Sequence, residues 1–260
     1  MEIGTAKPTP EELKEAPHHF INNLSIQEEY SVGKYEKEAL KCLHEIFKKH
    51  DKVVLVGGSG LFANAVCNGL DILPVGDAKV RQHYEELLQL EGIEALQKEL
   101  KEKDPAYFEI VDIKNPRRLI RALEVCKISG LPYSHFRNKK HVKRDFAIVK
   151  IGIVPDKEIL IERINRRVDD MLAAGWLQDC KLLYPHRNLN ALKTVGYTEL
   201  FDFIEGEMGW EETVQKMKTN TWHYAKRQLT WFRKDKEIKW FSPDDDAQVY
   251  SYITDFISSQ

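Results

Sequence analysis

The stretch that most constrains the fold is a short apolar run that ends in a cluster of glycines. Residues 52–56 (KVVLV) have the length and composition of a buried strand, and residues 57–60 (GGSG) turn the chain at once into a helical pattern. The apolar positions of that helix include Leu61, Ala65 and Leu70. A buried strand that feeds a glycine turn and then a helix is the repeating unit of a parallel sheet covered by helices. We therefore predict an α/β fold.

The composition is that of an ordinary globular chain. Its 260 residues carry 39 Lys and Arg against 41 Asp and Glu, for a net charge of -2, and 42% of them are hydrophobic. No apolar run approaches the roughly 18 residues that a membrane span requires, and the first ten residues do not resemble a targeting peptide. We therefore expect a cytoplasmic protein without membrane contact, and the balanced net charge neither favours nor excludes nucleic acid.

The cysteines and histidines give no indication of a metal site or a disulfide framework. Cys42, Cys67, Cys126 and Cys180 contain no C-x-x-C pair and have no histidine at zinc spacing. Free cysteines are among the most frequently buried residues, so we expect four reduced thiols in packed positions. No metal is assigned to protein side chains.

The middle of the chain differs from its two ends. From Pro74 to about Leu131 the pattern is helical and highly charged, whereas residues 146–154 return to strand character and Asp156 follows as a helix start. The remainder reads as largely helical to about Lys234, then extended, then as a last amphipathic helix. We predict an α/β core made of residues 1–74 and 141–260, with a helical insertion over residues 75–140.

The glycine turn allows two functional interpretations besides a tight turn. Backbone amides ahead of a helix N-terminus form a natural seat for phosphate. The spacing of Gly58, Gly60 and Ala63 also satisfies a loose dinucleotide fingerprint, which would make the protein a dehydrogenase. That reading needs an acidic residue at the end of a second strand, whereas Asp71 and Asp77 lie in a proline-containing loop.

Two predicted helices carry closely spaced arginines. In the first, Asn115 is a good N-cap, and Arg117 and Arg121 share a face with Glu124 one turn further. Guanidinium groups there suit phosphates or bases, although a solvated face with one ion pair is the commoner arrangement. In the second, residues 163–172, Arg163, Arg167 and Asp170 fall at i, i+4 and i+7. They either clamp an anionic leaving group or form an exposed ion-pair ladder.

A third helical pattern, residues 222–233, interleaves aromatic and cationic side chains. Trp222, Ala225, Leu229 and Phe232 form its apolar stripe. Aromatic rings beside cations suit single-stranded RNA, because bases stack on the rings while the cations meet phosphates. The apolar stripe itself is more often core than ligand surface.

Taken in order, seven segments resemble the tRNA dimethylallyltransferases. They are Gly4–Pro8 (GTAKP), Pro17–His19, Leu55–Leu61, Asn115–Glu124, Arg163–Leu172, Val195–Tyr197 and Lys226–Arg233. The resemblance implies a nucleotide-binding P-loop-type sheet with a helical tRNA-binding insertion. It also implies transfer of a dimethylallyl group from dimethylallyl diphosphate to N6 of the adenosine 3′ of the anticodon, position 37, in a monomeric enzyme that uses Mg²⁺ with the diphosphate.

The resemblance also implies roles for individual residues. Arg167 matches the arginine that binds the diphosphate, and Ser59, where many relatives have Thr, matches a residue beside the reacting base. The residues that match tRNA contacts are Ser59, Arg81, Arg117, Arg118, Leu119, Ile120, Arg121, Lys193, Thr194, Val195, Gly196, Tyr197, Thr198 and Arg227. Together they predict a surface for the anticodon stem-loop.

One part of the family pattern has no counterpart in these 260 residues. Relatives begin with a strand, a G-x-x-x-x-G-K-[ST] loop and an Asp-Ser segment whose Asp is the general base, and this sequence contains neither motif. We therefore expect a core that is incomplete at its N-terminus, an exposed apolar edge at residues 53–56, and a chain that is inactive or impaired by itself. The alternative is a tRNA-binding protein that has lost the transferase chemistry.

Overall fold

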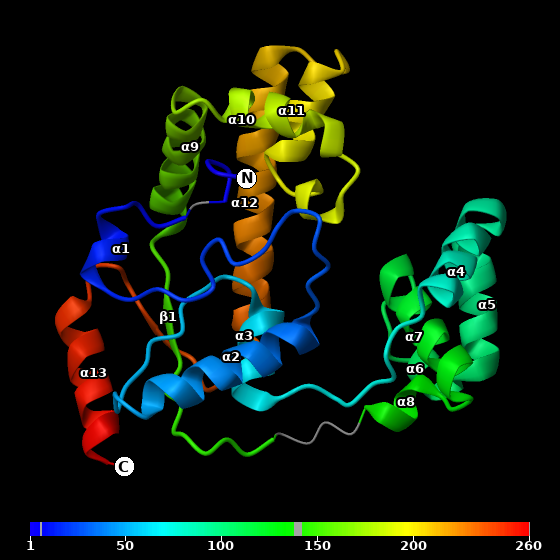
Figure 1. The fold of residues 1–260 in the computed structure, drawn as a ribbon, viewed down its shortest axis with the longest axis horizontal. Helices are drawn as coiled ribbons and strands as arrows, with labels where there is room; N and C mark the ends of the chain where they lie inside the picture. Colours follow the sequence, from blue (N-terminus) through cyan, green and yellow to red (C-terminus); the bar gives the residue numbers. More distant parts are fainter. Residues whose placement is uncertain (6, 138–141, 260) are drawn as a thin grey trace. The chain divides into compact units, whose positions relative to one another are not determined.

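The structure, a computed structural model, describes residues 1–5, 7–137 and 142–259. Its strands and longer helices are β1 (Ile151–Ile153), β2 (Lys239–Phe241), α2 (Val32–Phe47), α3 (Gly60–Asn68), α4 (Ala78–Glu91), α5 (Ile93–Lys103), α7 (Pro116–Ser129), α9 (Lys157–Ala173), α10 (Trp176–Leu183), α11 (Tyr197–Ile204), α12 (Trp210–Phe232) and α13 (Asp246–Ser258). Three short helices, α1 (Glu12–Glu15), α6 (Pro105–Phe108) and α8 (Tyr133–Phe136), and two 3₁₀ turns, η1 (Tyr184–His186) and η2 (Asn190–Leu192), connect them (Figure 1).

The chain divides into two compact units. The first contains residues 1–63 and 146–260, and the second contains residues 64–145. The insertion predicted over residues 75–140 falls inside the second unit, and its function stays a prediction.

The first unit contains the sheet. Strands β1 and β2 pair in parallel, with Ile151 opposite Lys239 and Ile153 opposite Phe241. Helix α12 packs against α9 and α11 (Figure 1). The buried residues between α9, α10, α11 and α12 include Val168, Trp176, Cys180, Leu192, Tyr197, Leu200, Phe201 and Met217. The predicted α/β class, with a parallel sheet, is confirmed.

The sheet is smaller than the sequence predicts. Residues 53–56 form no ladder with any other described segment, and Val54 and Val56 are each 88% exposed. The prediction of a strand there is wrong for this structure, because a strand needs neighbours that accept and donate its backbone hydrogen bonds. Of the strand predicted at residues 146–154, only Ile151–Ile153 is assigned as strand, and the backbone hydrogen bonds to β2 extend one residue further at each end, to Lys150 and Val154. The apolar side chains of Val54, Leu55 and Val56 are exposed, as expected, but they do not form the edge of a sheet.

The second unit is helical. Helices α4, α5 and α7 pack together around Tyr84, Leu96, Leu100, Leu119 and Leu123, each at most 1% exposed. Helix α7 begins as predicted: Asn115 Oδ1 accepts from the Arg118 backbone N–H at 3.3 Å, and Pro116 occupies the first turn.

Two expectations about side chains are also tested by the fold. Of the four cysteines, Cys126 and Cys180 are buried as expected, whereas Cys42 and Cys67 are only partly so. No helix in the described part of the chain is long and apolar enough to cross a membrane.

Candidate functional site

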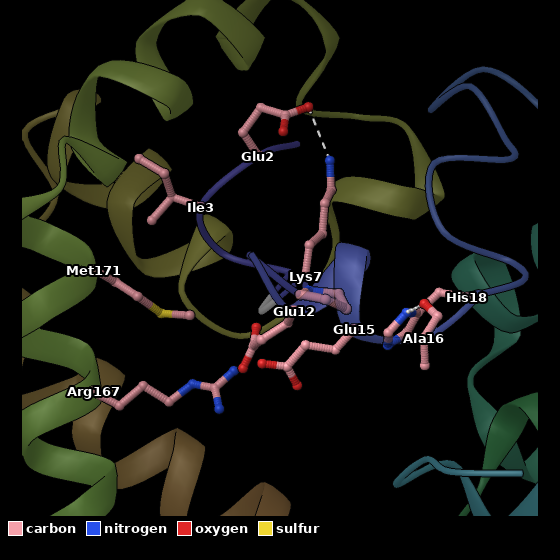
Figure 2. A pocket seen from close by; sticks show the side chains of 10 residues that line it. Glu2, Ile3, Lys7, Glu12, Glu15, Ala16, His18, Arg167 and Met171 are labelled. Carbon is pink, nitrogen blue, oxygen red and sulfur yellow. Dashed lines mark hydrogen bonds and ion pairs between the residues drawn. The ribbon is translucent and has the colours of Figure 1, made fainter. Parts of the chain in front are cut away.

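A cavity of about 830 Å³ lies between the N-terminal segment and α9 (Figure 2). It is lined by Glu2, Ile3, Lys7, Pro8, Glu12, Glu15, Ala16, His18, Arg167 and Met171. Two of the predicted segments, residues 4–8 and 163–172, therefore meet in one place. They are separated by more than 150 residues of sequence, and only the tertiary structure brings them together.

Arg167 reaches this cavity from one face of α9, one turn before Met171. The side chain is exposed and makes no ion pair with the described residues, and Figure 2 shows its guanidinium pointing toward Glu12 and Glu15. The ion-pair ladder that was one alternative for Arg163, Arg167 and Asp170 is not formed in this structure; the neighbouring Asp169 pairs with Lys218 at 2.7 Å. Arg167 therefore keeps its hydrogen-bond donors available to a ligand.

Lys7 is a second cation of the cavity. Its ammonium pairs with Glu2 at 2.9 Å, and its side chain is only 20% exposed. Sequence reasoning assigned Lys7 no role, although it lies within the GTAKP segment that carries the resemblance. A lysine and an arginine in one cavity offer donors to an anion with several oxygens, such as a diphosphate, which would compete there with the carboxylates of Glu2, Glu12 and Glu15.

The N-terminal segment is held in place by α10 and α11. The ring of Trp176 occupies the space that a Cβ atom would need at Gly4 and at Gly196. The Tyr197 hydroxyl and the Glu2 backbone N–H both donate to Asp179 Oδ2, at 2.8 and 3.1 Å. Burial, together with the bond to Asp179, raises the pKa of Tyr197 far above its ordinary value. Tyr197 therefore stays a neutral donor at any physiological pH.

Residues 193–198 are ordered by a buried carboxylate that sequence reasoning missed. Glu199, 3% exposed, accepts from the Gly196 backbone N–H at 2.6 Å, from Thr198 at 2.9 Å and from Asn220 at 2.6 Å. The donors come from the segment itself and from α12, so the segment is fixed to that helix. The signal in the sequence was a glutamate three residues after a glycine at a helix start.

Four residues predicted to contact tRNA are buried. Leu119 and Tyr197 are 0% exposed, Ile120 is 7% exposed, and Gly196 is buried with its N–H bonded to Glu199. The helical period turns the Leu119 and Tyr197 side chains toward the cores, so the structure exposes neither side chain, and the predicted role of these segments in tRNA contact stays a prediction. The four buried residues pack in the cores next to the exposed residues of the same segments.

Other predicted contacts are accessible. Lys193 and Thr194 are exposed, and Val195 and Thr198 are partly so. Arg227 is exposed and lies 5.8 Å from the centre of the Tyr224 ring, as the interleaved pattern of α12 suggests.

The glycine turn packs against α12. Gln228 donates to the Gly58 carbonyl at 2.8 Å, and the Trp231 ring lies where a side chain at Gly60 would be. The glycines are therefore explained by the close approach of α12. Ser59, between them, is exposed. The structure brings Ser59 and the aromatic and cationic segment of α12 to one surface of the first unit.

The second unit presents an arginine surface. Arg81, Arg117 and Arg118 are exposed and Arg121 is partly exposed. The ion pair expected between Arg121 and Glu124 is present at 2.6 Å, but Glu124 is fully buried, so this face is not simply solvated. No group of three or more His, Cys, Asp or Glu side chains that could hold a metal ion is found among the described residues.

Comparison with known proteins identifies the family. The IPP transferase family matches residues 1–235. The chain belongs to the IPP transferase family. A tRNA dimethylallyltransferase of Christiangramia forsetii is 47% identical over 230 residues, which are 88% of this chain and 76% of that protein. A tRNA dimethylallyltransferase 1 of Bacteroides fragilis is 43% identical, covering 97% and 84%.

Solved structures agree with this IPP transferase fold. The full-length tRNA isopentenylpyrophosphate transferase of Bacillus halodurans is 34% identical with a TM-score of 0.69, covering all of this chain and 83% of that one. A eukaryotic dimethylallyltransferase acting on tRNA has a TM-score of 0.81 at 23% identity, covering 99% and 70%, and that likeness concerns the fold alone. The dinucleotide-fingerprint interpretation of the glycine turn has no support from these relatives.

Proposed function

We propose that this IPP transferase modifies tRNA by moving a dimethylallyl group from dimethylallyl diphosphate to N6 of the adenosine at position 37, just 3′ of the anticodon. The observation that carries the proposal is the cavity whose lining includes both Arg167 and Lys7. Both cations belong to segments that resemble the transferases, and its closely related proteins are tRNA dimethylallyltransferases by name.

The reaction requires charge neutralisation. The N6 lone pair forms a bond to C1 of the dimethylallyl group while the C1–O bond breaks, and diphosphate leaves with the bonding electrons. N6 gives its proton to a base that is not assigned among these residues. Arg167 and Lys7 would stabilise the negative charge that develops on the leaving oxygen. Arginine suits this role because its guanidinium stays protonated and offers a planar fork of donors.

Mg²⁺ is expected to accompany the diphosphate. The described residues do not gather three carboxylate, histidine or cysteine side chains around a common point. The three glutamates of the cavity are therefore not assigned as its ligands, and no step is derived through the ion.

The RNA partner is proposed to be the anticodon stem-loop. Arg81, Arg117, Arg118 and Arg121 would bind phosphates from the second unit. In the first unit, Ser59, Lys193, Thr194 and Arg227 would line the surface used by the reacting loop. Exposed guanidiniums favour phosphate, and aromatic neighbours such as Tyr224 favour a base.

A second candidate is RNA binding without transfer. It is favoured by the exposed arginines Arg81, Arg117 and Arg118, which suit RNA phosphates whether or not a prenyl group is transferred. We expect the 260 residues by themselves to bind the stem-loop and to transfer the prenyl group poorly, because no general base is assigned among them.

The test uses the whole 260-residue chain, an unmodified anticodon stem-loop and dimethylallyl diphosphate. Binding of each ligand is measured by calorimetry, and product by mass spectrometry of the RNA. Arg167→Gln should weaken binding of the diphosphate about tenfold or more, since a charge-assisted hydrogen bond is removed. Arg166→Gln, an exposed neighbour on α9 outside the cavity, is the matched control.

The outcomes separate the candidates. Transfer that depends on Arg167 supports the proposed reaction. Stem-loop binding without any product favours the RNA-binding alternative. A chain that binds neither ligand would contradict both, and equal effects of the two arginine substitutions would contradict the assignment of the cavity.

A further inference from the structure

The second unit contains a buried carboxylate that joins three parts of the chain. Glu124 on α7 is fully buried, and its Oε2 accepts from Arg121 Nη1 at 2.6 Å and from Arg81 Nη2 of α4 at 3.3 Å. Its Oε1 accepts from the backbone N–H of Asp77 at 3.1 Å, at the N-cap of α4. One side chain therefore ties α4, α7 and the loop before α4 to a single point.

The surrounding contacts leave little freedom. Arg121 Nη2 also donates to the Pro74 carbonyl at 3.0 Å, so its guanidinium bridges Glu124 and the loop. A Cβ atom at Gly76 would lie 2.9 Å from Glu124 Oε1, so the loop passes directly over the carboxylate. The side chains of Arg81 and Arg121 nevertheless remain 51% and 32% exposed. Each guanidinium is therefore bonded to Glu124, while its side chain stays partly accessible to solvent.

We propose that Glu124 is a positioning residue for RNA binding: it fixes the guanidiniums of Arg81 and Arg121 so that their remaining donors meet RNA phosphates. The inference rests on the proposed function, which supplies the RNA. Arg117, exposed on the same helix and without an ion pair among the described residues, has no such support. The surface therefore combines two fixed arginines with others that are not held by a carboxylate.

Charge alone would give the opposite expectation. The negative charge of Glu124 offsets one positive charge of a surface that is proposed to attract RNA. If binding depended on net charge alone, replacing Glu124 with a neutral residue should therefore strengthen it. Fixing planar donors reduces the conformational freedom that binding removes, which improves affinity without adding charge. The effect of neutralising Glu124 therefore has a different sign in the two accounts.

The test is Glu124→Gln in the full chain, with stem-loop affinity measured across a range of salt concentrations. Glutamine keeps the size, but its amide NH₂ would face the donors of Arg81 or Asp77. We expect affinity to fall about tenfold, within the range for residues coupled in one ion-pair network. The slope of log Kd against log salt should fall by roughly 0.7 to 0.9 for each phosphate that the arginines no longer neutralise.

A second buried carboxylate, Asp104, provides the control for destabilisation of the helical unit. Asp104 is 1% exposed and accepts from the backbone N–H groups of Tyr107 and Ser134 and from the Ser134 hydroxyl, but not from an arginine. Asp104→Asn should lower the thermal midpoint and leave the salt slope unchanged. Binding is measured well below both midpoints, after circular dichroism has shown that both variants are folded.

Double substitutions show whether Glu124 acts through the arginines. Arg81→Gln should weaken binding in the parent chain and have little further effect beside Glu124→Gln, whereas Arg117→Gln should weaken binding equally in both backgrounds. Unchanged or tighter binding by Glu124→Gln would overturn the inference, as would the same decrease of salt slope in Asp104→Asn. If the parent chain does not bind the stem-loop, the proposed function fails first.

Discussion

The close approach of Trp176 to Gly196 gives a prediction whose magnitude follows from the structure. Gly196 has φ +91°, a conformation that side chains rarely adopt, and the Trp176 ring fills the position of its missing Cβ. Replacing Gly196 with alanine should therefore cost free energy of unfolding for two separate reasons. Both reasons act on the segment 193–198, which the IPP transferase resemblance assigns to tRNA.

The two costs can be estimated separately. A left-handed backbone conformation costs an L-residue roughly 1–2 kcal/mol. Inserting a methyl group into a packed core costs about 1–3 kcal/mol more, because the ring must move. Gly196→Ala should therefore destabilise the protein by about 2–5 kcal/mol. Gly206 is a matched control, since it has φ +79° with no atom within 4 Å of its Cβ position, and Gly206→Ala should incur only the first cost.

The assay is urea-induced unfolding followed by circular dichroism, with the free energy of unfolding extrapolated to water. Trp176→Phe provides a further check, because the smaller ring leaves more room and Gly196→Ala should cost less in that background. Equal destabilisation by Gly196→Ala and Gly206→Ala would refute the argument from close packing. Stem-loop affinity of Gly196→Ala at low temperature reports whether the 193–198 segment also moves.

Two further predictions concern stability. Burial raises the pKa of the Cys180 thiol to about 12, whereas the thiol of the unfolded chain ionises near its ordinary pKa. The free energy of unfolding should therefore be unaffected by this thiol below about pH 9 and should fall as the pH rises from about 9 toward 12. The fall should be less steep in Cys180→Ala. Asn115→Ala should lower the free energy of unfolding by about 1 kcal/mol because the α7 cap is removed, measured in urea, and a serine there should restore most of it.

Local patterns were sufficient for most helices of this IPP transferase. The cap at Asn115 and the helix start at Asp156 predicted where α7 and α9 begin, at Pro116 and Lys157. These features act within a few residues of chain, so the sequence carries them directly. The strand predicted at residues 53–56 shows the limit, since an apolar run becomes a strand only when other segments supply its hydrogen bonds.

The candidate site was predictable only in part. Arg167 and the arginines of α7 stand out in the sequence, because cations at helical spacing form a recognisable pattern. Lys7 and Glu199 do not, and Glu124 stands out only as the partner of a surface ion pair, since the sequence does not distinguish a buried glutamate from a solvated one. Their importance comes from partners far away in the chain, such as Arg81 for Glu124 and Asn220 for Glu199.

The sequence by itself determined the family, the helical elements and the identity of the charged groups, because the order of motifs and the periodicity of apolar residues can be read along the chain without knowledge of its spatial contacts. Only the tertiary structure decided which of these groups are neighbours. It placed Lys7 beside the Arg167 cavity, buried Leu119 and Tyr197, and put one carboxylate beneath two arginines. Such groupings depend on long-range packing, in which burial and charge pairing act between segments that no local pattern connects.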